Sequence, residues 1–262
     1  MPLPNRLTLK AILALVILWE TFAFGMRNPR VAPHIPELIT VSFPSFSLFS
    51  GVREPDGLAA AILLIRASFA TLCRVFLGFA FGTLLGLALG AVPFLLPGQR
   101  RSSKWLLAAL RSIPLFALLP LWVYWFSGSE FGIISYITFA VAVFIGTGVY
   151  EGMAQTPRHW LNHATVLKAS SLFAFKHIIL PGALPAILHQ VYWVSGLLPA
   201  FCLGAEYTGS ALSGLGGITY QSYLYANVGQ LLILALIYLF LGLTIRRLVY
   251  TFTIAPQKLL YL

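Results

Sequence analysis

The stretch NHATVLKASSLFAFKHIILP, at positions 162–181, is the part of the sequence whose residue types and spacing most suggest a specific contact. It separates two long apolar runs and carries two lysines, two histidines and the apolar residues Leu172, Phe173 and Phe175. Apolar side chains mixed with cations are typical of a short helix that docks on a partner, or of one that rests on lipid headgroups. The residues alone leave both alternatives open.

Four charged residues lie within or beside apolar runs, where an unpaired charge costs several kcal/mol. They are Glu20, Arg74, Arg111 and Glu206. We expect Arg111 to extend its long side chain to the inner membrane surface. Glu20 and Glu206 are compatible with the outer headgroup level, and for these two and Arg74 a functional role stays open.

The sequence lacks the motifs of an enzyme or a metal site. It has one Asp and no His-Glu-x-x-His, Gly-x-Ser-x-Gly or Gly-Lys phosphate-binding motif, so we expect no catalytic residue and no bound ATP. The histidines do not pair with a carboxylate or a Cys at metal-ligand spacing. Cys73 and Cys202 lie in apolar runs, as small buried residues do. We therefore predict no metal and no cofactor on this chain.

The composition indicates a membrane protein. Hydrophobic residues make up 59% of the 262 residues and charged residues only 9%, whereas soluble domains carry about 25% charged residues. The net charge of +10 comes from short basic clusters between apolar runs, without the basic stripe that a nucleic acid requires. We expect a lipid environment and no nucleic-acid partner.

The apolar runs predict an all-α protein with about six transmembrane helices, since about 20 apolar residues cross the hydrocarbon and continuous runs exclude a barrel. Prolines 29, 33, 36 and 44 forbid one helix through the segment 27–67, which we expect along the outer surface with a short helix near 58–66. The expected spans are 9–26, 68–96, 105–126, 131–150, 183–206 and 228–250.

The distribution of basic residues predicts the orientation. With the N-terminus inside, eleven of the seventeen Lys and Arg residues fall in inner segments, so both termini are expected in the cytoplasm. The chain then divides into an N-terminal span with an outer-surface segment (1–67), a transmembrane core (68–250) with a cytoplasmic loop at about 152–181, and a cytoplasmic tail (251–262).

Two further sets of residues have expected roles inside the membrane. Four glycines recur every fourth residue on one helical face and predict close helix packing: Gly78, Gly82, Gly86 and Gly90. Six polar positions are candidates for a solute path, with helix packing as the alternative for each: Ser112, Tyr124, Thr138, Tyr192, Ser195 and Glu206.

The loop resembles the cytoplasmic loop of membrane subunits of binding-protein-dependent ATP-binding-cassette (ABC) importers. That family's motif is Glu-Ala-Ala, three residues, Gly, nine residues, Ile, any residue and Leu-Pro, and Ala164, Ile178, Leu180 and Pro181 fall at matching positions. The segments CRVFLGFAFGTLLGLALG, ALRSIPLFALLPLWVYWF, PGALPAIL and GAEYTGSALSGLGG are also similar to the family. The likeness covers about residues 66–250 and is greatest to the branch that imports nitrate, sulfonates and taurine.

The resemblance implies a type I ABC importer permease fold in a bacterial inner membrane. It implies two permease subunits, of the same or different chains, ABC ATPase subunits that hold ATP and Mg, and an external solute-binding protein. The pore would work by alternating access, driven through the loop. The residues that would then couple to the ATPase are Asn162, Ala164, Lys168, Ser170, Leu172, Phe173, Phe175, Lys176 and Pro181.

The loop departs from the family at three positions. Asn162 replaces the Glu, His163 an Ala, and Lys168 the Gly. Because Lys is strained at positive φ, we expect either a different turn or a more continuous helix. Without the Glu, we expect apolar docking more than a salt bridge. The rival functions are a gradient-driven secondary transporter or channel, which should show paired acids or inverted repeats that we do not find, and a scaffold or exporter half.

Overall fold

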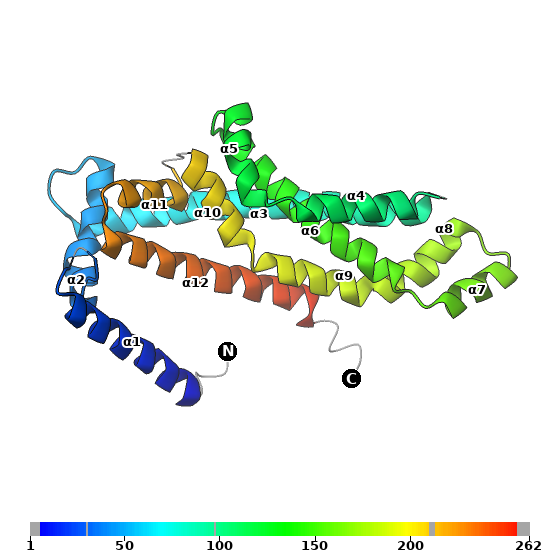
Figure 1. Cartoon of the computed structure of the whole chain (residues 1–262), viewed down its shortest axis with the longest axis horizontal. Helices are drawn as coiled ribbons and strands as arrows, with labels where there is room; N and C mark the ends of the chain where they lie inside the picture. The colour runs from blue at the N-terminus through cyan, green and yellow to red at the C-terminus, as the bar shows by residue number, and fades with distance from the viewer. Residues whose placement is uncertain (1–5, 30, 97, 210–212, 256–262) are drawn as a thin grey trace. The chain divides into compact units, whose positions relative to one another are not determined.

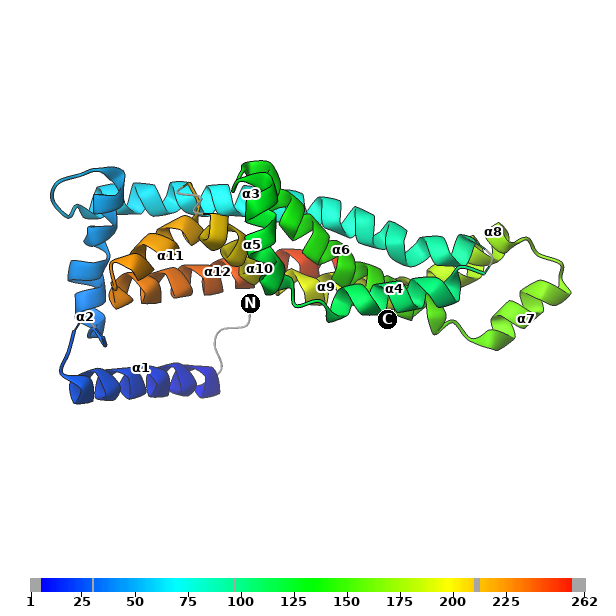
Figure 2. The ribbon, with the colours of Figure 1, turned by 45° about the horizontal axis from the view of Figure 1, so that its top comes forward.

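The computed structural model describes residues 6–29, 31–96, 98–209 and 213–255. Helices and their connections account for these ranges, which contain no strand (Figure 1 and Figure 2). The all-α prediction is therefore confirmed. The helices are α1 (Arg6–Met26), α2 (Ile35–Glu37), a π-helix (Leu38–Ser42), a 3₁₀ helix (Pro44–Ser50), α3 (Gly57–Leu95), α4 (Arg100–Ser112), α5 (Leu115–Phe126), α6 (Glu130–Ala154), α7 (Arg158–Val166), α8 (Ser171–Ala174), a π-helix (Phe175–Ile179), α9 (Leu180–Ser195), α10 (Leu198–Gly209), α11 (Leu215–Leu224) and α12 (Val228–Thr253).

Four helical segments within the described ranges are long and apolar enough to cross a membrane: α3, Ser171–Ser195, α6 and α12. The expected span at 105–126 is not one continuous helix, because α4 and α5 meet at an angle of 85° and form at most one broken span. Ile113 has extended backbone angles before Pro114, which is the conformation that a following proline favours. The prediction of about six spans thus becomes four long helices and one bent pair.

Three other expected boundaries are corrected. The short helix near 58–66 is not separate, because α3 runs unbroken for 39 residues, and Asp56 accepts hydrogen bonds from the backbone nitrogens of Leu58 and Ala59 at its start. At 1.5 Å per residue this helix is about 58 Å long, well beyond the hydrocarbon thickness of about 30 Å. The expected span at 183–206 is divided between α9 and α10. In α1, the apolar part is the shorter segment Leu13–Met26.

The chain forms two compact units, of which the first comprises residues 1–69 and 212–237. Within it, the proline-rich segment is broken into short helices, as predicted. This segment packs on the start of α12, where a Cβ on Gly229 would lie 2.0 Å from Oγ of Ser42. The Gln230 amide also donates to Oγ of Ser45 at 2.9 Å.

The second unit comprises residues 70–211 and 238–262, and α6 runs through its core. The four glycines of α3 that share one face lie against α6. A Cβ at Gly82 would lie 2.6 Å from Val141, and one at Gly78 would lie 2.5 Å from Ile137. A Cβ at Gly86 or Gly90 would also lie within 3.0 Å of an atom of α6, at 2.9 and 2.6 Å respectively. Any side chain at these positions would push the two helices apart.

Candidate functional site

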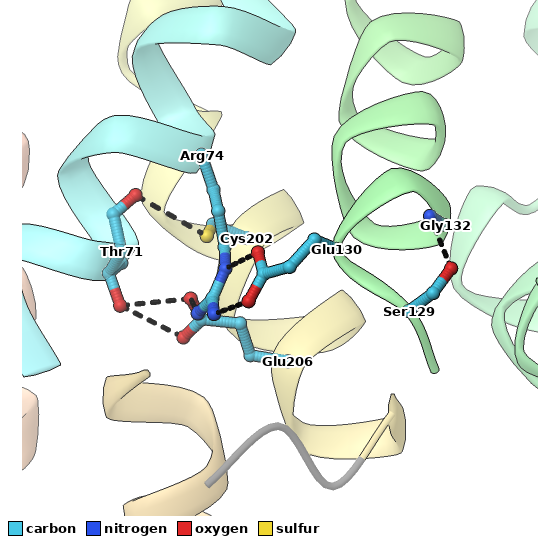
Figure 3. A network of polar contacts seen from close by, with 7 residues as sticks. All are labelled: Thr71, Arg74, Ser129, Glu130, Gly132, Cys202 and Glu206. Atoms are coloured by element: carbon cyan, nitrogen blue, oxygen red, sulfur yellow. Dashed lines mark hydrogen bonds and ion pairs between the residues drawn. The ribbon is translucent and has the colours of Figure 1, made fainter. Parts of the chain in front are cut away.

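A buried network of charged and polar groups in the second unit is centred on Arg74 of α3 (Figure 3). Arg74 is 3% exposed. Its Nη1 donates to Oε1 of Glu206 at 2.6 Å, and its Nε donates to Oε2 of Glu130 at 2.7 Å. Its Nη2 donates to the other oxygen of Glu130. Glu130 therefore receives a two-pronged contact along one edge of the guanidinium, which is the strong geometry of arginine–carboxylate pairs.

The same network fixes Glu206 of α10. Its side chain is fully buried, and both of its oxygens accept from the Thr71 hydroxyl, at 2.9 and 3.0 Å. Thr71 stands three residues before Arg74 on α3, so the two side chains lie on one face of the helix. Cys202, one turn before Glu206, places its Sγ 3.9 Å from the Thr71 carbonyl oxygen. The buried charge of Glu206 is thereby both paired and hydrogen-bonded, as burial requires.

Glu130 differs from Glu206 in its surroundings. It is the first residue of α6, where a negative charge is favoured by the helix dipole, and its side chain is 62% exposed. Ser129 caps the helix by accepting from the Gly132 nitrogen at 3.2 Å. One cation therefore lies between two carboxylates, one buried and one exposed.

Sequence reasoning identified half of this network. Arg74 and Glu206 stood out as charges in apolar runs, whereas Thr71 and Glu130 were missed. Glu130 lies between two expected spans and looked like a loop residue. The sequence showed no sign of paired acids, yet two acids that are 56 and 132 residues from Arg74 meet at its guanidinium. The one indication in the sequence was Arg74 itself, because an arginine within an apolar run requires an acidic partner or water.

The two other charged candidates lie elsewhere. In the first unit, Glu20 accepts from the Ile35 nitrogen at 2.8 Å and lies 2.7 Å from Nδ1 of His34. The hydrogen bond with the Glu20 carboxylate raises the pKa of His34 above its ordinary value. In the second unit, Nη1 of Arg111 lies 3.6 Å from Oε1 of Glu151, and both side chains are about half exposed.

The six candidates for a solute path are not gathered into one place. Ser112 lines a cavity of about 430 Å³ together with Arg111 and Glu151. Tyr192 accepts a hydrogen bond from Nε of Arg246 at 2.9 Å. The others are Tyr124, which is highly exposed, Thr138, which is half buried, Ser195, which is buried and donates to the Tyr192 carbonyl, and Glu206 of the Arg74 network.

The loop between α6 and α9 consists of α7 and α8 with Lys168 between them. Lys168 has a φ of +51°, so it occupies the left-handed position that the family motif gives to glycine. Its nitrogen donates to the Thr165 carbonyl at 3.0 Å, and the Ala169 nitrogen donates to the Ala164 carbonyl at 2.9 Å. These two bonds form the Schellman motif that ends a helix. Neither expected alternative holds: the sharp turn is retained with a lysine in it.

The predicted coupling residues divide into exposed and packed groups. Leu172 and Phe173 are exposed by 66% and 51%, whereas Ala164 is buried and Phe175 packs on the core. Ser170 caps α8 by accepting from the Phe173 nitrogen at 3.2 Å. The others, Asn162, Lys168, Lys176 and Pro181, are exposed.

Comparison with known proteins shows the family. Residues 82–253, more than half of the chain, match the family described as the binding-protein-dependent transport system inner membrane component. A probable ABC transporter permease of Haemophilus influenzae is 33% identical over 60% of this chain and 63% of its own length. The bicarbonate permease CmpB of Synechococcus elongatus is 27% identical over 89% and 82%. The putative aliphatic sulfonates permease SsuC of Escherichia coli is 30% identical over 51% and 50%.

Solved structures agree with this fold. The MetNI methionine ABC transporter, in an inward-facing conformation, has a chain with a TM-score of 0.52 and 27% identity, covering 71% of this chain and 96% of that one. An amino acid ABC transporter gives a TM-score of 0.59 at 19% identity, over 82% and 98%. The chain belongs to the inner-membrane permease family of binding-protein-dependent ABC importers, and its relatives include a sulfonate permease and a bicarbonate permease.

Proposed function

We propose that this chain forms the solute pathway of an ATP-driven importer and is coupled to a separate ATPase subunit through the loop 162–181. The observation that carries the proposal is the exposed pair Leu172 and Phe173 on α8, directly after the left-handed turn at Lys168. Exposed apolar side chains flanked by cations form a surface suited to another protein.

The loop is packed on the core of the second unit and continues into a long helix, so a movement of the loop can be passed to the membrane. Ala164 on α7 is buried, and Phe175, two residues after Phe173, packs on the core of the second unit. From Ser171 the chain is helical through to Ser195, in a segment long and apolar enough to span the membrane. A push on Phe173 would therefore reach the membrane along a continuous helix. This supports a mechanism in which ATPase closure drives alternating access.

The rest of the assembly follows from the same proposal. We place both termini in the cytoplasm, because that orientation puts most Lys and Arg residues inside. A second permease subunit would complete the pore, ATP and Mg would be held by the ATPase subunits, and an external binding protein would deliver the solute. Since relatives are named for sulfonates and bicarbonate, the solute class we propose is a small oxyanion.

The Arg74 network favours one alternative function, transport driven by an ion gradient, because buried acid–base pairs occur in such carriers. Uptake by proteoliposomes that contain this chain and a proton or sodium gradient, but no ATPase and no ATP, would support it. The importer proposal expects no uptake under those conditions.

The decisive test compares two exposed phenylalanines in a complex reconstituted with its ATPase and binding protein. We expect Phe173→Asp to abolish ATP-dependent uptake, because a charge cannot enter an apolar docking surface. Phe252, which is 79% exposed in α12, provides the matched control, and Phe252→Asp should retain uptake. Full uptake by Phe173→Asp with the ATPase still bound would refute coupling through this loop.

A further inference from the structure

The two carboxylates bound to Arg74 are held to different degrees. Glu206 is fully buried and also accepts from Thr71, so the Nη1 side of the guanidinium has a fixed partner. The edge formed by Nε and Nη2 is held by Glu130, whose side chain is 62% exposed (Figure 3). One edge of a buried arginine thus ends in a contact that is accessible from outside the unit.

The charges permit exchange at this edge. Glu206 alone balances the charge of Arg74, so Glu130 adds a second negative charge to the cluster. A monovalent anion in place of the Glu130 carboxylate would leave the charge in contact with Arg74 unchanged. The displaced carboxylate would turn into solvent, which its 62% exposed side chain already reaches. Exchange therefore buries no additional charge, which is the main cost in a low-dielectric site.

The geometry selects the kind of anion. Nε and Nη2 of an arginine present two parallel N–H groups, which match two oxygen atoms on one central atom. Glu130 supplies such a pair of oxygens, and carboxylates, sulfonates, nitrate and bicarbonate have the same arrangement. Chloride and other single-atom anions must share one atom between the two N–H groups, so they cannot form two parallel hydrogen bonds.

The surroundings indicate access from water. A charged carboxylate facing lipid costs several kcal/mol, so charged groups in membrane proteins face a water-filled cavity or another protein chain. Because the Glu130 side chain is largely exposed in this single chain, its open side is expected to face water or a neighbouring subunit and not lipid. In an importer, the surface between permease subunits is where a solute passes.

We propose that Arg74 is a binding residue for an oxyanion solute, and that Glu130 occupies the site until the solute replaces its carboxylate. Thr71 and Glu206 are positioning residues, which hold the guanidinium in place during the exchange. This inference rests on the proposed function and adds to it the residue that contacts the solute.

The test uses the full chain in lipid nanodiscs and methanesulfonate as the probe. Dissociation constants are obtained from the rise in thermal unfolding midpoint with methanesulfonate concentration, against chloride at equal ionic strength. Glu130→Gln keeps the side-chain shape but weakens its hold on Arg74, because hydrogen bonds between charged groups are about twice as strong as neutral ones. We expect methanesulfonate to bind at least about tenfold more tightly to this variant than to the wild type.

Glu151→Gln is the matched control, because Glu151 is a similarly exposed carboxylate paired with another arginine of the same unit. It should bind methanesulfonate like the wild type. Glu130→Gln leaves Arg74 paired with Glu206, so the variant is expected to fold. Glu130→Asp, which keeps the charge, should show a smaller gain than Glu130→Gln. Adding Arg74→Lys to Glu130→Gln should remove the gain, because lysine lacks the two-pronged edge.

Equal methanesulfonate binding by Glu130→Gln, Glu151→Gln and the wild type would overturn the inference, as would an equal gain with chloride. The nanodisc measurement does not involve the ATPase. The proposed function is judged separately, by whether the wild-type chain assembles with an ATPase and imports solute. A chain that couples to ATP but shows no gain in Glu130→Gln would retain the function and lose this site.

Discussion

The Arg74 network and the loop at 158–181 distribute polarity in opposite ways. In the network, the charges of Arg74 and Glu206 lie inside the protein, and pairing with Glu130 links α3, α6 and α10. In the loop, the apolar side chains of Leu172 and Phe173 lie on the outside, next to Lys168 and Lys176. The network is completed by the chain's own residues, and the loop surface is suited to contact with another molecule. Loss of the buried arginine should therefore lower stability strongly, whereas changes on the loop surface should affect function at little cost to stability.

The largest expected effect is on the free energy of unfolding, and it compares the loss of a buried arginine with the loss of a half-exposed one. Arg74→Met leaves the buried Glu206 without its cation and should lower the free energy of unfolding by about 3–5 kcal/mol. Arg111→Met removes the half-exposed pair with Glu151 and should cost no more than about 1 kcal/mol. Denaturant titration in detergent micelles measures both. Equal losses would mean that burial is not what makes the network matter.

A second, smaller effect concerns the packed glycines. Gly82→Ala places a Cβ about where Val141 lies and should cost roughly 1–3 kcal/mol through overpacking. Gly57→Ala is the control, since a Cβ there meets no atom within 4 Å. The same denaturant titrations apply. A neutral Gly82→Ala would show that α3 and α6 can separate without loss.

The loop offers a change in the stabilising direction. Lys168→Gly should raise the free energy of unfolding by about 0.5–1 kcal/mol, because glycine adopts positive φ without steric strain. Lys168→Ala keeps the Cβ and should give little of this gain. If both variants behave alike, the lysine is not strained. Thermal unfolding midpoints of the three proteins would decide.

The smallest effect is the pH response of an exposed pair in the first unit. The hydrogen bond with Glu20 raises the pKa of His34, and the charge of Glu37 adds to this. A raised pKa means that the pair stabilises the fold below the ordinary histidine pKa and loses this contribution as pH rises through the folded-state value. NMR titration of labelled histidine should show that Glu20→Gln lowers the pKa of His34 from its wild-type position. A His34 pKa that is the same in the wild type and in Glu20→Gln would contradict the contact.

The loop was the more predictable of the two regions. Its two short helices and its turn depend on residues close together in sequence, so the motif at 162–181 located them. The lysine in the turn was harder to interpret, because backbone hydrogen bonds from Lys168 and Ala169 fix the turn whatever side chain is present.

The network was less predictable, because it depends on contacts between residues far apart in the chain. An arginine in an apolar run signals that a partner exists without saying which acid it is. The helix boundaries failed for a related reason. Hydropathy does not report the bend at Ile113–Pro114 or the continuity of α3 across Arg66, since both are set by backbone geometry.

The glycine face of α3 has a mechanical consequence. Gly78, Gly82, Gly86 and Gly90 meet side chains or backbone of α6 closely over more than three turns, and such interdigitated surfaces resist sliding. The contact does not involve Glu130, so an anion that displaces that carboxylate would leave it intact. This stretch of α3 and α6 should therefore move as one rigid body during a transport cycle. Bending is then expected at breaks between helices, such as the one between α4 and α5.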